Sequence, residues 1–163
     1  MSKQILPTAA AVLIVLAGIW LMSSSARPMP EVTFNLVDGR TLHTADLRGQ
    51  PALINFWSVS CEVCLHDMPV LSRLQETLKD HGLMVIGVAA PYDPPPAVIA
   101  TAEKLAPAYP ISLDVHGEVS KAFGDIRVTP TSFLIDPAGN INYSGRGPID
   151  ETRIRATLLT FQR

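Results

Sequence analysis

The chain has 163 residues, which is the length of one ordinary domain with a short appendage and makes two hydrophobic cores improbable. Lysine and arginine number 13 against 15 aspartates and glutamates, for a formal net charge of −2, so the chain lacks the basic surface that nucleic-acid binding requires. Hydrophobic residues make up 47% and charged residues 17%, a composition that excludes a disordered chain.

The first predicted element is an uncharged segment of 18 residues, Ile5 to Met22. As a helix it would extend about 27 Å, close to the hydrocarbon thickness of a bilayer. Lys3 supplies a positive flank on the side expected to stay cytoplasmic. A cleaved signal peptide is the alternative, because Ser24-Ser25-Ala26 offers the small residues that a peptidase reads, but its apolar region would typically be shorter. We therefore favour a retained anchor.

The anchor divides the chain into three parts. Residues 1–22 are predicted to be a signal anchor and transmembrane helix, residues 23–30 a linker, and residues 31–163 the folded domain. With or without cleavage, we expect the chain from about Arg27 onward to be exported to the periplasm or cell exterior. Disulfides persist in such a compartment.

The first half of the domain has the pattern of a strand–helix–strand unit. Two short strands are predicted within Phe34 to Leu42 around an Asp-Gly turn. Ala52 to Trp57 is an apolar run of strand length that should be buried on both faces of a sheet. From Cys61 to about His81 apolar residues recur at helical spacing, with Pro69 predicting a kink. Leu83 to Ala90 follows as a second buried strand, so the order implies a right-handed parallel crossover.

The second half adds shorter elements. Pro91 to Pro96 contains four prolines and predicts an extended loop, followed by a helix over about Ala97 to Leu105. The remaining predicted elements are a strand at Ile111 to Asp114, a helix at Glu118 to Phe123, a hairpin of Ser132 to Asp136 with Ile141 to Ser144, and a helix from Asp150 to about Phe161. The whole predicts an α/β fold with one mixed sheet and helices on both faces.

Cys61 and Cys64 are too few for a disulfide scaffold or a four-sulfur zinc site. At i and i+3 at the start of a helix they share one face, and their expected Cα separation of about 5 to 6 Å suits a disulfide. The helix N-terminus favours a thiolate at Cys61 and lowers its pKa below that of an ordinary thiol. We therefore expect Cys61 to be the nucleophile and the more buried Cys64 to be the resolving thiol. An inert disulfide or half of a metal site is the alternative.

Three motifs together resemble the thioredoxin superfamily: Asn55-Phe-Trp-Ser-Val-Ser-Cys-Glu-Val-Cys64, Asp67-Met-Pro69 and Val128-Thr-Pro-Thr-Ser-Phe-Leu-Ile-Asp136. More narrowly, the chain is similar to membrane-anchored thiol:disulfide oxidoreductases of the TlpA/ResA type, relatives of the cytochrome c maturation reductants. The similarity runs from about residue 30 to the end. It implies a thioredoxin-like fold and an enzyme that exchanges disulfides through its cysteine pair without a cofactor.

The resemblance also implies roles for single residues. Asp67 falls where anchored members carry a glutamate beside the active site that handles protons; a helix-surface acid is the alternative. Pro130 matches a cis-proline opposite the disulfide, which would leave the backbone of Thr129 free to pair with an extended substrate, whereas an ordinary trans-proline is the alternative. Trp57 would line the site or pack in the core. Asn55 stands where cytoplasmic thioredoxins bury an aspartate, so Asp67 is the only nearby candidate for a proton relay.

Two positions depart from the family pattern. Ser60 stands where most members have a tryptophan directly before the first cysteine, which thins the expected apolar collar and leaves the substrate preference open. Val63 occupies a position where proline is common and tends to favour the reduced form. The reduction potential therefore cannot be transferred by analogy.

Two other functions fit parts of the sequence. Ser58-Val-Ser-Cys61 places a hydroxyl three residues before the cysteine, as in thiol peroxidases, but Ile54 stands where their proline is expected. Alternatively, Cys61, Cys64 and His66 could hold Cu(I), a soft ion that suits thiolates. On a helix, however, His66 points away from the face of the two cysteines, so we assign no metal site.

The sequence thus predicts a reductant tethered to the outer face of the cytoplasmic (inner) membrane. Its expected partners are exported proteins with disulfides and a membrane electron donor of the DsbD/CcdA type. Apocytochromes, copper-site proteins and other thiol enzymes are all possible clients, and the motif alone does not set the direction of electron flow.

Overall fold

The computed structural model describes residues 27–161. In this part of the chain the strands are β1 (Thr33–Leu36), β2 (Thr41–His43), β3 (Ala52–Trp57), β4 (Met84–Ala89), β5 (Ile111–Leu113), β6 (Thr131–Ile135) and β7 (Ile141–Arg146). The α-helices are α2 (Glu62–Leu78), α3 (Pro95–Leu105), α4 (Glu118–Ala122) and α5 (Glu151–Thr160), with 3-10 turns at Thr44–Leu47 and Lys79–His81. The predicted α/β class and the strand–helix–strand unit are confirmed.

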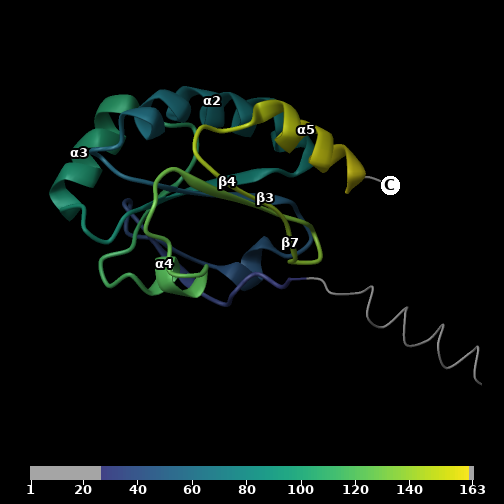
Figure 1. Ribbon diagram of the computed structural model, residues 1–163, viewed down its shortest axis with the longest axis horizontal. Helices are drawn as coiled ribbons and strands as arrows, with labels where there is room; N and C mark the ends of the chain where they lie inside the picture. The colour runs from purple at the N-terminus through teal and green to yellow at the C-terminus, as the bar shows by residue number, and fades with distance from the viewer. Residues whose placement is uncertain (1–26, 162–163) are drawn as a thin grey trace, which may run out of the picture.

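All the strands join one mixed sheet in the order β2-β1-β5-β4-β3-β6-β7 (Figure 1). β3, β4 and β5 run parallel, and the other neighbours are antiparallel. Because β3 and β6 are antiparallel and Phe56 pairs with Thr131, the last residues of β3 lie beside the first residue of β6, at one end of the strands. The segments that follow Trp57 and precede Thr131 therefore leave the sheet side by side.

The sheet carries a hydrophobic core on each face. Along β3, Leu53 and Trp57 pack in the core beneath α2, α3 and α5, whereas Ile54 and Phe56 pack in the core on the α4 face. On that second face the rings of Phe56, Phe123 and Phe133 form a cluster with centroids 5.2 to 5.9 Å apart. Burial on both sides explains why this strand is a continuous apolar run.

One predicted boundary is wrong. The proline-rich segment Pro91 to Pro96 was expected to be entirely extended, but α3 begins at Pro95 rather than at Ala97. Proline is tolerated in the first helical turn, because the N–H that it lacks has no partner within the helix there and its fixed φ already suits the helix. The last two prolines of the run therefore start the helix.

The start of the described chain is attached to the domain. Residues 27–30 were predicted to belong to the linker, yet Met29 is buried and its N–H donates to Gly139 O at 2.9 Å. Ile141 N–H donates in turn to Arg27 O at 2.8 Å. The predicted transmembrane helix at Ile5 to Met22 lies outside the described residues, and within residues 27–161 no helix has the length and hydrophobicity needed to cross a bilayer.

Candidate active site

The two cysteines lie where β3 passes into α2 and are joined in a disulfide. Cys61 is the N-cap of the helix: its Sγ accepts a hydrogen bond from Cys64 N–H at 3.2 Å. The Cα atoms are 5.2 Å apart, within the separation expected from the spacing. Cys61 is partly exposed and Cys64 is only 2% exposed. An incoming sulfur can therefore reach Cys61, while Cys64 lies beneath it.

The loop before β6 borders the same edge of the sheet. The Thr129–Pro130 peptide bond is cis, as the resemblance implied. Gly147 N–H donates to Pro130 O at 2.9 Å, which fixes this loop to the end of β7. Thr129 is partly exposed and Pro130 is buried. Thr129 thus lies partly at the surface, in the bend that leads into β6.

Asp67 is not an acid on the helix surface. It lies on α2 one turn after Cys64, is only 4% exposed, and its Oδ2 accepts a hydrogen bond from Ile149 N–H at 2.8 Å. The carboxylate therefore joins α2 to the loop before α5. Burial, together with the charge of Asp67, raises the pKa of Tyr109 above that of an ordinary phenol. Asp67 thus lies in a largely buried layer behind the disulfide.

Trp57 lies in the core rather than on the surface. It is 1% exposed and packs in the same core as Cys64, so in this structure a client cannot touch the ring. A Cβ at Gly87 would stand 3.3 Å from the indole nitrogen, which shows how closely the ring packs against β4. The expectation that Trp57 lines the site is corrected in favour of core packing.

Asn55 is also buried, and it does not replace the missing acid. Its side-chain amide donates to the Ser132 hydroxyl at 2.9 Å across β3 and β6. An amide so paired stabilises the sheet and offers no titrating group. Asp67 is therefore the buried acid on α2 nearest in sequence to Cys64.

Sequence reasoning missed the buried acid that binds the cysteine loop, Asp93, in the proline-rich segment after β4. Its Oδ1 accepts from the Ser58 hydroxyl and its Oδ2 from Val59 N–H, each at 2.9 Å. A signal was available, because Asp93 comes four residues after the end of β4, a buried strand parallel to β3, and the carboxyl ends of parallel neighbours lie at the same end of a sheet. The Ser58 hydroxyl, proposed from sequence as a peroxidase feature, is committed to this carboxylate.

A pocket of about 600 Å³ adjoins the cysteines between α2 and the loop before α5. Its lining residues are Glu62, Val63, His66, Asp67, Val70, Pro148, Ile149 and Glu151. His66 is exposed, and within residues 27–161 no three His, Cys, Asp or Glu side chains are grouped to hold a metal ion. The copper-binding alternative therefore gains no support from the geometry of the described residues.

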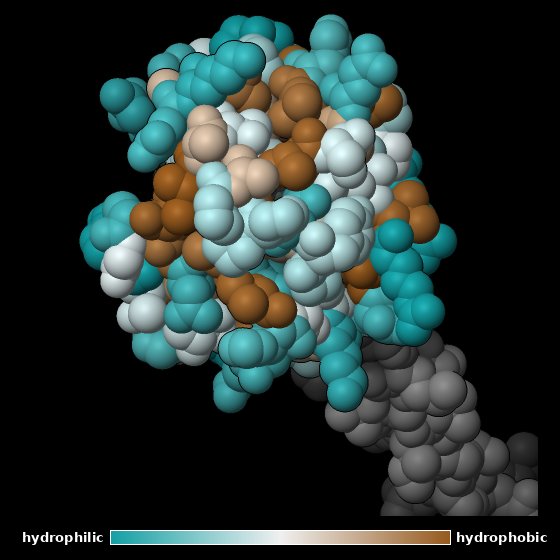
Figure 2. Space-filling model, turned by 90° about the vertical axis from the view of Figure 1, so that its left-hand side faces the viewer, coloured by the Kyte–Doolittle hydropathy of each residue, from teal (hydrophilic) through white to brown (hydrophobic). Residues whose placement is uncertain are grey.

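Exposed apolar side chains lie on the segments that adjoin the ends of β3, β4 and β6, where the disulfide is. Val63 between the cysteines, Tyr92 after β4 and Val128 before the cis-proline are 42%, 62% and 55% exposed. Figure 2, which faces the left-hand side of Figure 1, shows hydrophobic patches set among hydrophilic surface. Exposed apolar groups beside a reactive sulfur are suited to contact an unfolded or extended polypeptide.

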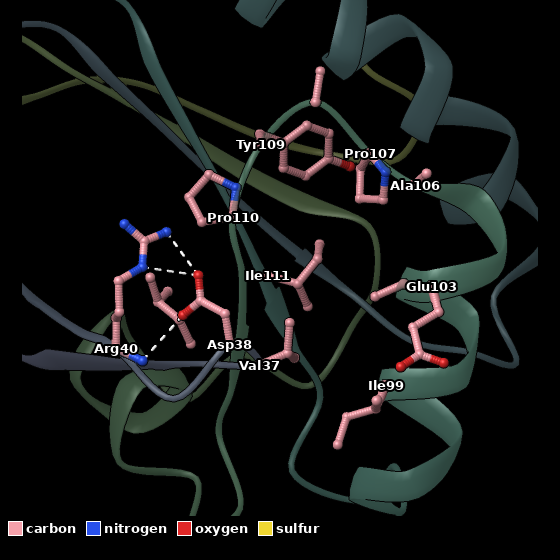
Figure 3. A pocket seen from close by; sticks show the side chains of 13 residues that line it. Val37, Asp38, Arg40, Ile99, Glu103, Ala106, Pro107, Tyr109, Pro110 and Ile111 are labelled. Atoms are coloured by element: carbon pink, nitrogen blue, oxygen red, sulfur yellow. Dashed lines mark hydrogen bonds and ion pairs between the residues drawn. The ribbon is translucent and has the colours of Figure 1, made fainter.

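Another cavity, of about 530 Å³, lies beside Ile111, the first residue of β5 (Figure 3). It is bordered by the turn between β1 and β2, by the end of α3 and by the segment that leads into β5. At one side Arg40 and Asp38 form an exposed ion pair of 2.7 Å. Ile111, the first residue of β5, pairs with Gly87 in β4, and Tyr109, which the charge of Asp67 affects, also lines this cavity. The cavity therefore lies behind the buried layer that contains Asp67, and neither cysteine lines it.

Comparisons with known proteins agree with this geometry. The model of the Redoxin family matches residues 24–158. The thiol-disulfide oxidoreductase ResA of Bacillus subtilis is 26% identical over 80% of this chain and 72% of its own length. The thiol:disulfide interchange protein DsbE of Pseudomonas fluorescens is 34% identical over 77% of this chain and 68% of its own. A crystal structure of a thioredoxin-family thiol:disulfide interchange protein from Chlorobium tepidum superposes with a TM-score of 0.74 at 28% identity, covering 83% of this chain and 98% of the other.

Proposed function

The chain belongs to the Redoxin family and is a thiol-disulfide oxidoreductase with a thioredoxin-like fold, of the TlpA/ResA type; from this we propose that it reduces disulfides in exported client proteins. One observation carries the proposal: a partly exposed Cys61 Sγ at the start of α2, with the buried Cys64 one turn behind it. A pair so placed has one sulfur to meet a client and a second to release it.

The reaction follows from the two positions. In the reduced enzyme the Cys61 thiolate, stabilised by the helix N-terminus, attacks one sulfur of the client disulfide. The client S–S bond breaks, a mixed disulfide with Cys61 forms, and the second client sulfur leaves as a thiolate that takes up a proton. The Cys64 thiolate then attacks Cys61 Sγ, which releases the other client thiol. Two electrons have passed to the client, and the enzyme is left with the disulfide seen in this structure.

Two further residues complete the proposed site. Asp67, buried one turn beyond Cys64, accepts the proton that the resolving thiol must lose before it attacks. The backbone of the partly exposed Thr129, next to Pro130, pairs with an extended client segment. Val63, Tyr92 and Val128 supply apolar contacts around that segment.

The proposed site of action is the outer face of the cytoplasmic membrane, with residues 1–22 as anchor. We expect full-length chain in the membrane pellet and digestion of the domain by protease added to intact spheroplasts. An inner-membrane protein and a cytoplasmic protein serve as markers for each fraction. Digestion only after lysis would place the domain on the cytoplasmic side, and a shortened chain in the periplasmic fraction would show that the segment is cleaved.

Reductant activity requires a low potential for the Cys61–Cys64 couple. Equilibration with glutathione or dithiothreitol is expected to give a value near about −270 mV, the thioredoxin range. Such an enzyme needs electrons from a membrane donor, and we propose one of the DsbD/CcdA type. A value near about −120 mV, typical of a strong oxidant, would instead show that the pair inserts disulfides.

A further inference from the structure

The loop between β3 and α2, which leads to Cys61, is hydrogen-bonded to the buried carboxylate of Asp93. Asp93 is 8% exposed and accepts from the Ser58 hydroxyl and from Val59 N–H. Cys61 N–H donates to Ser58 O at 3.1 Å, so the residue that binds Asp93 also binds the cysteine backbone. The charge of Asp93 therefore affects the conformation of the turn formed by Ser58 to Cys61.

The direction of the hydrogen bonds in this loop follows from counting protons. A carboxylate only accepts, so the single proton of the Ser58 hydroxyl is directed at Asp93. The contact of 3.0 Å between the Ser58 and Ser60 hydroxyls then has Ser60 as its donor. Ser60 N–H also donates to Ser58 Oγ at 3.3 Å. Ser58 Oγ thus donates one bond and accepts two, which is the full capacity of a hydroxyl.

This ordering affects the residue beside the nucleophile. Ser60 directly precedes Cys61, and its proton is directed at Ser58 rather than at the cysteine. A thiolate at Cys61 therefore gains no hydrogen bond from this neighbour. It also lies two residues from an amide that binds a buried negative charge, which disfavours a second negative charge nearby. Both effects oppose the stabilisation that the helix N-terminus provides.

We propose that Asp93 is a positioning residue that acts through Ser58 to direct the Ser60 proton away from Cys61, and so keeps the Cys61 thiolate less stable than its place on α2 alone would make it. The inference deepens the proposed function and rests on it for the direction of electron flow. A less stabilised thiolate makes the reduced pair a better electron donor, because strong oxidants of this chemistry owe their potential to a stabilised reduced form.

The test is the alkylation of Cys61 in the reduced full-length protein by iodoacetamide across pH, with the modified cysteine identified by mass spectrometry. Asp93→Asn keeps the size of the side chain and removes its charge. The new amide can donate to Ser58 Oγ, so the Ser58 hydroxyl can donate to Ser60 and the Ser60 proton can turn toward Cys61. At pH 6 we expect alkylation of Cys61 about three- to tenfold faster than in the parent, since one pKa unit corresponds to a factor of ten in thiolate. The potential of the couple should become less reducing. Mere loosening of the loop would change the alkylation rate by the same factor at every pH and leave the midpoint of the pH profile in place, whereas the proposal predicts a lower midpoint.

Serine variants separate charge from proton direction. Ser60→Ala in the parent should change the alkylation rate by less than about twofold, because the Ser60 proton is already committed to Ser58. Ser58→Ala keeps the Asp93 charge but releases that proton, so we expect an acceleration smaller than that of Asp93→Asn, and the added Ser60→Ala should remove it. If Asp93→Asn does not fold, as judged by circular dichroism, the comparison of Ser58→Ala with the double variant Ser58→Ala, Ser60→Ala tests the inference instead.

Two results would overturn the inference: an alkylation profile of folded Asp93→Asn that superimposes on the parent, or a parent whose alkylation slows markedly on Ser60→Ala. Failure of the proposed function gives a different result. In that case the unsubstituted protein reduces no protein disulfide, while the differences in Cys61 alkylation persist.

Discussion

Cys61→Ser is expected to lower the rate of insulin disulfide reduction about a thousandfold or more, to the rate of the supplied dithiol alone. A hydroxyl is not ionised near neutral pH and cannot form the mixed disulfide, so the first step is lost. Turbidity of reduced insulin measures the effect. Glu76→Ala, on an exposed turn of the same α2 helix, is the matched control and should keep the parent rate.

The companion variant Cys64→Ala separates the two sulfurs. It retains the nucleophile but lacks the resolving thiol, so clients should accumulate on Cys61 as mixed disulfides that dithiothreitol releases. Cys61→Ala should trap none. The reverse outcome, with adducts on Cys64 only, would exchange the assigned roles, and full insulin reduction by Cys61→Ser would remove this pair from the reaction.

Phe56→Ala is expected to lower the free energy of unfolding by about 3 to 5 kcal/mol. The ring is 1% exposed and contacts Phe123 and Phe133 edge-on, at centroid distances of 5.4 and 5.9 Å. Its loss leaves a cavity in a core where the neighbours are fixed by strand and helix. Urea unfolding of the oxidised protein measures the change.

Leu159→Ala is the control for that experiment. Leu159 is 63% exposed on α5, and its truncation should change stability by no more than about 0.5 kcal/mol. Equal losses for the two variants would show that the aromatic cluster on the α4 face contributes no more than a surface contact. Phe56 and Cys64 pack in the cores on opposite faces of the sheet, so folded Phe56→Ala should retain a measurable rate of exchange.

The elements that carry the cysteines were predictable because their signals are local. A strand buried on both faces must be apolar throughout, as Ala52 to Trp57 is, and α2 shows its apolar residues at helical spacing. The N-cap of α5 was equally visible: Asp150 Oδ1 accepts from Arg153 N–H at 2.9 Å. The boundary at Pro95 was missed because proline both breaks and begins helices.

The parts of the site that were not predictable depend on distant contacts. The position of Asp67 along α2 gives no sign in the sequence that the side chain is buried. Its burial results from a loop 82 residues further along the chain, in which Ile149 N–H donates to the Asp67 carboxylate. The position of Trp57 depends on Gly87, which lacks a side chain where the indole packs. Asp93 reaches the cysteine loop from another strand end, 34 residues from Val59. The hydrophobic periodicity of a single segment cannot predict contacts between residues so far apart in the sequence.

The hydrogen bonds of Met29 and Arg27 to Gly139 and Ile141 fix the corner at which the chain enters the domain. The hairpin follows the end of β6, and Ile135 of that strand pairs with Ala52 at the start of β3, so the chain enters the domain one strand length, about 17 Å, from the end that bears Cys61. With residues 1–22 as the proposed anchor, a domain held at that corner would turn its reactive sulfur away from the lipid. Under the same proposal, clients would approach from the aqueous side, and recharging by a membrane-embedded donor would require the whole domain to reorient.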